Sequence, residues 1–322
     1  MGSVAELVGR ARQGDPRAVA RLISMVEDES PMLRDLTATL ARSRPEGQGA
    51  HIVGLTGAPG VGKSTSTSAL VTALRQRDKR VGVLAVDPSS PFSGGALLGD
   101  RIRMQDHDTD PGVFVRSMAS RGHLGGLAWS TPQALRVLEA AGCDVIVVET
   151  VGVGQSEVEI ASLADTTVVL LAPGMGDGIQ TAKAGILEIG DLFVVNKADR
   201  DGASQVVRDL RAMIRLATRP EGTWVPPVLR TEAVSGTGIE EFADSLDQHW
   251  RHLLDSGELQ RRRVRRAREE IEAVALAALR SRWGSVDHGT GLDALAAALA
   301  RGETDPYAAA EALLKEDGGC DE

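Results

Sequence analysis

The sequence is poor in cysteine, with only Cys143 and Cys320 among its 322 residues. A disulfide framework or a cluster of thiolate metal ligands needs several cysteines at short spacings, so the sequence indicates neither. The chain must instead bury a hydrophobic core. With 42% hydrophobic and 25% charged residues, it is long enough for one substantial core with smaller appended elements.

The sequence also has no apolar run long enough to span a membrane, which takes roughly 20 residues. Its first segment is polar and helical in pattern rather than signal-like, so we expect a cytoplasmic protein without a membrane partner. The net charge of -9 argues against nucleic acid as a partner. The run RRRVRRAR at 261–268 is a local basic exception.

Three regions follow from the hydrophobic pattern. Apolar residues recur at helical spacing before residue 43, with Pro31 separating two segments, so residues 1–48 are expected to form a helical N-terminal extension. In residues 49–250 short apolar runs alternate with amphipathic patterns, which is typical of an α/β domain with a mostly parallel sheet. Residues 251–322 return to helical patterns, through a charged segment 258–282 and alanine-rich helices near 291–300 and 305–315.

Seven strands are expected in the central region because their segments are rich in Val, Ile and Leu. They are His51–Thr56, Arg80–Val86, Val113–Arg116, Asp144–Glu149, Thr166–Leu171, Leu192–Val195 and Val228–Ala233.

A glycine-rich phosphate-binding motif follows the first of these strands. It comprises Gly57, Ala58, Pro59, Gly60, Val61, Gly62, Lys63, Ser64 and Thr65, and fits the pattern G-x-x-x-x-G-K-[ST] between a strand and a helix. The glycines allow backbone N–H groups to converge on phosphate oxygens, and the helix adds its positive end. Lys63 adds a charge at the outer phosphates, and the Ser64 hydroxyl is suited to Mg²⁺. The domain is therefore predicted to be a phosphate-loop NTPase.

A base-selecting motif, Asn196-Lys197-Ala198-Asp199, follows the sixth strand. The Asp199 carboxylate can accept hydrogen bonds from the ring N–H and the amino group of guanine, whereas adenine would leave this charge unpaired. GTP and GDP are the predicted ligands. The alternative is that Asn196 or Asp199 merely caps a helix.

A second candidate for guanine contact lies at Glu232–Gly236, after the seventh strand. Ala233 and Ser235 lie in this segment, whose backbone N–H groups could reach the guanine oxygen. A plain strand-to-helix turn explains the same residues equally well.

Carboxylates at strand ends are candidates for the magnesium site. Glu149 ends the fourth strand and is expected to act on Mg²⁺ directly or through water, with Ser64 as a second ligand. Asp87 and Asp100 could also reach the metal. From the residues alone, Asp87 in Asp-Pro is as readily a turn residue and Asp100 a helix cap.

Two glycine-containing segments, Ser117–Gly126 and Gly152–Glu157, are candidates for mobile switch loops beside the phosphates. The alternative is that their glycines only permit tight turns.

Taken in order, the motifs resemble those of a known family, the methylmalonyl-CoA mutase-associated GTPases that include MeaB and ArgK. The phosphate loop and NKAD are shared by many GTPases. The segments VDPSSP, GDRIRM and ETVGVGQSE together are close to family-specific, and the resemblance covers nearly the whole chain.

The resemblance implies a GTPase that acts as guardian of an adenosylcobalamin-dependent acyl-CoA mutase, gating cofactor loading and protecting or reactivating the mutase. It implies that Ser64, Asp87, Asp100 and Glu149 surround Mg²⁺, with Lys63, Glu149 and Asp100 supporting catalysis. It also implies a homodimer with contacts from the C-terminal arm. Val153 stands where some GTPases carry a water-orienting glutamine, so slow intrinsic hydrolysis is expected.

Two other functions compete with this one. A metallochaperone GTPase would need Cys or His ligands, for which only the pair His249 and His252 has suitable spacing. A kinase linked to basic amino-acid transport would need an acceptor pocket with a base, and no segment marks one.

Overall fold

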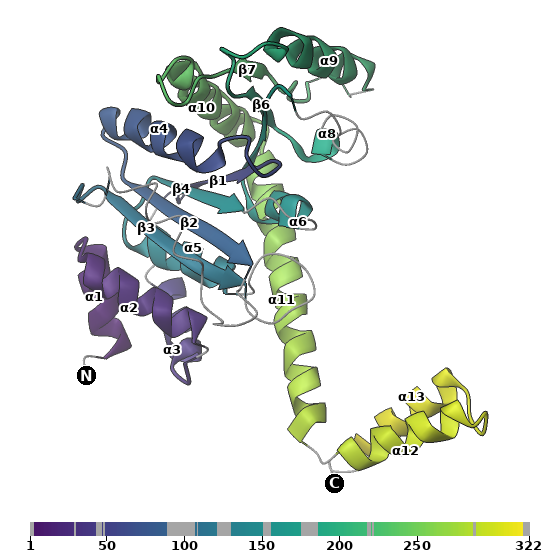
Figure 1. The fold of residues 1–322 in the computed structure, drawn as a ribbon. Coiled ribbons are helices and arrows are strands. Elements are labelled where there is room, and N and C mark those ends of the chain that lie inside the picture. Colours follow the sequence, from purple (N-terminus) through teal and green to yellow (C-terminus); the bar gives the residue numbers. More distant parts are fainter. Residues whose placement is uncertain are drawn as a thin grey trace. The chain divides into compact units, whose positions relative to one another are not determined.

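The computed structural model describes residues 3–28, 30–42, 47, 49–88, 107, 109–120, 130–150, 156–174, 186–217, 220, 222–285 and 288–317. The chain divides into two compact units, Met1–Arg263 and Val264–Glu322. Figure 1 shows the first unit as an α/β domain built around a single sheet.

The sheet has seven strands in the order β3-β2-β4-β1-β5-β6-β7, and every neighbouring pair is parallel. The predicted α/β fold with a mostly parallel sheet is therefore confirmed. The strands are β1 (His51–Thr56), β2 (Val81–Pro88), β3 (Val113–Ser120), β4 (Val145–Thr150), β5 (Thr166–Leu171), β6 (Leu192–Val195) and β7 (Val228–Arg230).

Alternate residues of the strands enter cores on opposite faces of the sheet, as the period of two requires. In β5, Val168 and Leu170 face α4 (Lys63–Gln76) and α10 (Ile239–Asp255). Val169 and Leu171 lie in a second core with α9 (Ala203–Leu216). A third core holds residues of β1, β2 and β4 with α5 (Thr131–Ala140) and α6 (Ser156–Leu163), and the short α8 (Ile186–Ile189) precedes β6. Because both faces are covered, the strands are continuously apolar.

The N-terminal region forms three helices, α1 (Val4–Arg12), α2 (Pro16–Glu27) and α3 (Leu33–Arg42). Two helical segments separated at Pro31 were predicted, and the structure has a further break between α1 and α2. There the Asp15 side chain accepts hydrogen bonds from the first backbone N–H groups of α2 and so caps that helix. The three helices share the hydrophobic core of α5 and the β1, β2 and β4 strands. Packing therefore makes them part of the first unit (Figure 1).

Four strands end at residues other than those predicted. β2 ends at Pro88 rather than Val86, and β4 ends at Thr150 rather than Glu149. β3 continues to Ser120 because it stays paired with β2, from Val81↔Val113 to Pro88↔Ser120. The first residues of the predicted switch loop 117–126 are therefore strand, and residues 121–129 lie outside the described part. β7 is shorter than predicted and ends at Arg230, since the chain then turns and Glu232 bridges to Thr237.

The predicted C-terminal helices are present as α11 (Glu258–Ser285), α12 (His288–Ala300) and α13 (Pro306–Asp317). Only the first residues of α11 belong to the first unit. Within the described ranges, no helix is long and apolar enough to cross a membrane.

Candidate nucleotide-binding site

The predicted nucleotide motifs all follow the carboxyl ends of neighbouring strands. The phosphate loop follows β1, Glu149 lies one residue before the end of β4, and Asn196 follows β6. In an open parallel sheet, ligands bind at this edge, because the loops after adjacent strands converge there. The topology thus brings together residues that are more than 130 positions apart in the chain.

The phosphate loop has the backbone conformation that its glycines predict. Gly57 and Gly62 have φ values of 145° and 96°, which residues with a Cβ rarely adopt. At Gly57 an added Cβ would clash with the carbonyl oxygen of Leu170, and at Gly62 it would lie 2.5 Å from the Asn196 side-chain nitrogen. A side chain at either position would therefore distort the loop or its neighbours.

Lys63 begins α4 and is buried beneath the loop. Its Nζ donates to the carbonyl oxygens of Gly57 at 2.6 Å and Ala58 at 3.2 Å. The amino end of α4 adds a partial positive charge at the same place. This arrangement of a lysine and a helix N-terminus suits an anionic ligand such as a nucleotide phosphate.

Asn196 fastens three segments to one another. Its Nδ2 donates to Val61 of the phosphate loop at 2.9 Å, and its Oδ1 accepts from Ala233 N at 3.1 Å and Thr231 Oγ1 at 3.3 Å. The neighbouring Lys197, with φ of 56°, donates to Gly60 at 2.6 Å. The predicted guanine motif is therefore held against the predicted phosphate loop, and the alternative of a simple helix cap does not account for these contacts.

The other residues predicted to contact guanine differ in their exposure. Asp199 and Ser235 are exposed, whereas Ala233 is buried. The Ser235 hydroxyl contacts Glu232 and Thr237 within its own turn. The Ala233 amide donates to Asn196 in this structure.

Glu149 is buried between two hydroxyl side chains of α4. Ser64 Oγ donates to its Oε1 at 2.6 Å, and Thr67 Oγ1 lies 2.9 Å from its Oε2. A carboxylate and a serine hydroxyl are hard oxygen donors, so Ser64 and Glu149 fit a magnesium ion. Sequence reasoning missed Thr67, although its position three residues after Ser64 places both on one helix face.

Other predicted site residues lie wholly or partly outside the described residues. The backbone of Asp87 lies in β2, but its side chain is not described, and Asp100 lies outside the described ranges. In the second predicted switch segment, Gly152–Gln155 also lie outside them, and Ser156 begins α6.

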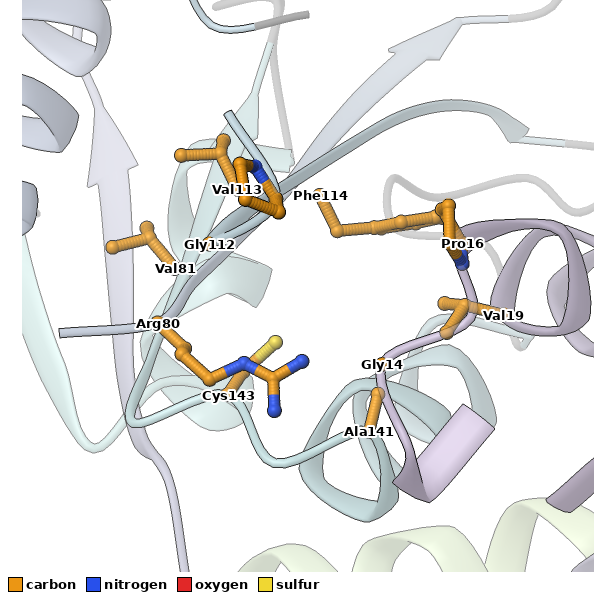
Figure 2. A pocket seen from close by; sticks show the side chains of 11 residues that line it. Gly14, Pro16, Val19, Arg80, Val81, Gly112, Val113, Phe114, Ala141 and Cys143 are labelled. Atoms are coloured by element: carbon orange, nitrogen blue, oxygen red, sulfur yellow. The ribbon is translucent and has the colours of Figure 1, made fainter. Parts of the chain in front are cut away.

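A cavity at the opposite edge of the sheet is too small for a nucleotide (Figure 2). It lies at the starts of β2 and β3, is lined by residues such as Arg80, Phe114 and Cys143, and has a volume of about 30 Å³. That is room for little more than one water molecule. Burial raises the pKa of the Cys143 thiol to about 12, so the thiol is a poor nucleophile there.

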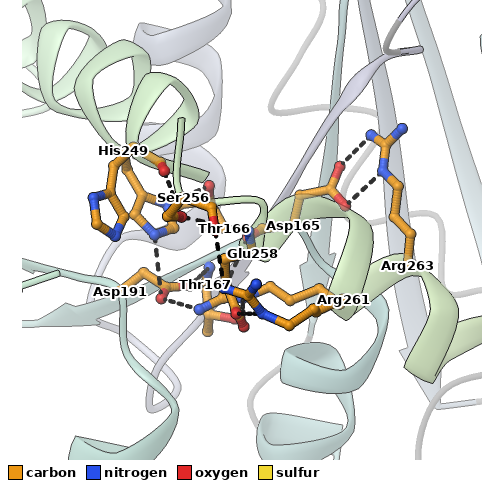
Figure 3. A network of polar contacts seen from close by, with 11 residues as sticks. Asp165, Thr166, Thr167, Asp191, His249, Ser256, Glu258, Arg261 and Arg263 are labelled. Atoms are coloured by element: carbon orange, nitrogen blue, oxygen red, sulfur yellow. Dashed lines mark hydrogen bonds and ion pairs between the residues drawn. The ribbon is translucent and has the colours of Figure 1, made fainter. Parts of the chain in front are cut away.

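A buried polar network also lies at that opposite edge, around Asp191 (Figure 3). Thr166 Oγ1 lies 2.6 Å from His51 Nε2 and 2.7 Å from His249 Nδ1. His249 Nε2 faces Asp191 Oδ1 at 3.4 Å. His249 thus has a structural role, and in the described part of the chain no three His, Cys, Asp or Glu side chains group as a metal site.

Part of the basic run 261–268 is engaged in ion pairs within the first unit. Arg262 pairs with Asp191 at 2.8 Å and Arg263 with Asp165 at 2.8 Å. Arg261 pairs with Glu258 one turn earlier on α11. Arg262 and Arg263 therefore anchor the start of α11 to the sheet, whereas the Arg261 pair lies within the helix.

Comparison with known proteins gives the family of this chain. The model of the family described as methylmalonyl-CoA mutase-associated GTPase MeaB matches residues 19–286. A Pyrococcus abyssi protein named as a GTPase is 46% identical over 314 residues, covering 97% of this chain and 96% of the relative. The GTPase ArgK of Escherichia coli is 37% identical over 271 residues, covering 83% and 82%.

A solved structure resembles almost the entire chain. The crystal structure of an LAO/AO transport system kinase covers 98% of this chain and 97% of its own, with 28% identity and a TM-score of 0.72. Residues 19–286, which the family model matches, include the predicted phosphate loop and the predicted guanine motif. This chain belongs to the MeaB family of methylmalonyl-CoA mutase-associated GTPases, and it is a GTPase.

Proposed function

We propose that this GTPase is Mg²⁺-dependent and acts as a guardian of an adenosylcobalamin-dependent acyl-CoA mutase. Hydrolysis of GTP to GDP and phosphate would drive a conformational cycle that gates cofactor loading and protects or reactivates the mutase. The cytoplasm is the proposed location. Membership of a family named for its association with methylmalonyl-CoA mutase is the observation that carries the choice of partner.

The geometry at the carboxyl edge of the sheet supports the proposed roles. Lys63 would neutralise the outer phosphates, and Ser64 and Glu149 would hold Mg²⁺ with Asp87 and Asp100. Bound Mg²⁺ would neutralise charge that develops on the phosphates during transfer to water. Glu149 and Asp100 join Lys63 as the proposed catalytic residues.

Guanine recognition is assigned to residues of two adjacent loops. Asp199 would accept from the guanine N–H groups, while Asn196 and Lys197 hold their loop against the phosphate loop. Ala233 and Ser235 would border the base from the segment after β7. The backbone of Gly57, Ala58, Pro59, Gly60, Val61, Gly62 and Thr65 would complete the phosphate cradle.

The three-part division into residues 1–48, 49–250 and 251–322 stays a prediction, as does the homodimer. Support for a dimer through the C-terminal arm comes from large apolar side chains that are exposed on α11, including Ile271 and Leu276. Exposed apolar helix faces favour association with another surface. In a dimer, the second copy of the chain would cover these side chains.

The test pairs this protein with a candidate acyl-CoA mutase encoded in the same genome. Calorimetry with GTP, GDP and ATP in Mg²⁺ should give guanine-only binding, and phosphate release should be slow and faster with the mutase. The mutase should also lose activity more slowly over repeated turnovers when the GTPase and GTP are present. A Lys63→Ala variant is the control for nucleotide dependence.

Either alternative function predicts a different result. A kinase would give a phosphorylated product in place of phosphate released to water. A metallochaperone would bind a transition metal through Cys or His, yet His249 is committed to the Asp191 network. No change in phosphate release or in mutase lifetime with any candidate mutase would contradict the guardian assignment.

A further inference from the structure

Helix α4 presents two hydroxyl groups to the two oxygens of one buried carboxylate. Ser64 Oγ donates to Glu149 Oε1 at 2.6 Å, and Thr67 Oγ1 approaches Oε2 at 2.9 Å. We infer that Thr67 is a positioning residue for magnesium binding. Its hydroxyl holds one carboxylate oxygen, so that the other remains beside Ser64.

The need for such a residue follows from the flexibility of glutamate. The last torsion of a Glu side chain has a broad, weakly restricted preference, so an isolated carboxylate rotates readily. At Glu149, the hydrogen bonds from Ser64 and Thr67 reach different oxygens and so define the plane of the carboxylate. The surroundings are also dry, because Thr67 is fully buried and Glu149 is 5% exposed. Water therefore cannot readily replace the Thr67 hydroxyl.

The Thr67 hydroxyl has one proton and two acceptors within reach. They are the carbonyl oxygen of Lys63 at 3.0 Å and Glu149 Oε2 at 2.9 Å. A hydrogen bond to an ionised carboxylate is roughly twice as strong as one between neutral groups. The proton therefore goes to Glu149, and the contact with Lys63 is the usual helical approach of a threonine to the preceding turn.

Three variants separate this role from a general effect on α4. Thr67→Val keeps the shape of the side chain and removes the hydroxyl, whereas Thr67→Ser keeps the hydroxyl. Thr72→Val is the matched control, because Thr72 on the same helix donates to the carbonyl four residues earlier, Ser68 O, at 3.1 Å. Thr72 is exposed, and Glu149 is not among the partners that its hydroxyl contacts.

The full-length protein is loaded with a fluorescent GDP analogue and titrated with Mg²⁺. The measured quantity is the fraction of the analogue that stays bound at each Mg²⁺ concentration. Loss of a side chain that orients a metal ligand typically weakens metal affinity about 10-fold or more. We expect Thr67→Val to raise the half-maximal Mg²⁺ concentration about 10-fold, by the same principle, with GDP affinity in EDTA unchanged. Thr67→Ser and Thr72→Val should behave as the wild type.

The inference rests on the Mg²⁺ dependence in the proposed function but not on the mutase, which is absent from this experiment. Equal Mg²⁺ titrations for the wild type and Thr67→Val would overturn it. So would a Thr67→Ser variant as impaired as Thr67→Val, since that result means that packing rather than the hydroxyl matters. A wild type that needs no Mg²⁺ would instead remove the magnesium assignment itself.

Discussion

Arg262 and Asp191 form a two-point ion pair that joins the start of α11 to the residue just before β6. Arg262 Nη1 donates to Asp191 Oδ2 at 2.8 Å, and Nη2 donates to Oδ1 at 2.9 Å. Burial by itself would raise the pKa of Asp191, but the nearby His249 ring and the hydrogen bonds from Arg262 outweigh it and lower the pKa to about 2. The Asp191 carboxylate is therefore charged, and the folded protein needs Arg262 to balance that charge.

Replacing Arg262 with alanine should destabilise the first unit because Asp191 would remain buried without its main counter-charge. Removing one partner of a buried ion pair typically costs about 3 kcal/mol. Urea unfolding followed by circular dichroism would measure the loss. Arg265→Ala is the matched control, since Arg265 is exposed on the same helix. Equal midpoints for the two variants would show that the ion pair adds no stability.

Replacing Lys63 with alanine should abolish tight binding of GTP. The variant loses a charged donor at the outer phosphates, and charge-assisted hydrogen bonds contribute about 1.5–3 kcal/mol each. The expected loss of affinity is about 100-fold, since each 1.4 kcal/mol corresponds to about a factor of ten. Calorimetric titration would measure it, with Lys79→Ala beyond the end of α4 as control. Unchanged affinity in Lys63→Ala would rule out the phosphate-loop assignment.

Replacing Asp199 with alanine should relax the preference for guanine over adenine. The variant can no longer accept from the guanine N–H groups, and adenine no longer faces an unpaired carboxylate. We expect GTP affinity to fall while ATP affinity stays equal or rises, as competition binding would report. Asp201→Ala, two residues further and also exposed, should keep the wild-type preference. A preserved preference in Asp199→Ala would assign base selection to another residue.

His51 should make the protein less stable in acid. Burial lowers the pKa of His51 to about 3, against a smaller opposing effect of Asp165. Between pH 6.5 and 3 the unfolded chain therefore binds a proton at this residue that the folded chain does not. Stability must fall as the pH falls through this window, by about 1.4 kcal/mol per pH unit.

Comparing the wild type with His51→Gln tests this pH dependence. The glutamine amide can still contact Thr166 but does not titrate. The free energy of unfolding of each protein is measured in urea at pH 6.5 and at pH 5. Between these two pH values the wild type should lose about 2 kcal/mol more than His51→Gln. Parallel pH profiles for the two proteins would show that His51 is not the group responsible.

The sequence alone determined the sheet and the nucleotide motifs. Continuous apolar runs are typical of strands that are buried on both faces, and the bounds predicted for Leu192–Val195 agree with those of β6. The glycines predicted the phosphate loop because its backbone needs a positive φ at positions such as Gly62. These features depend on local chemistry, so a linear pattern carries them.

Only the tertiary structure decided which distant residues meet. Thr67 has no motif of its own, and its contact with Glu149 exists because α4 packs beside the end of β4. The basic run 261–268 reads as a charged surface until Asp165 and Asp191 are brought to Arg263 and Arg262. The strand ends at Ser120 and Arg230 were likewise set by pairing with neighbours. Contacts between segments far apart in the chain depend on the arrangement of the strands, which local patterns do not encode.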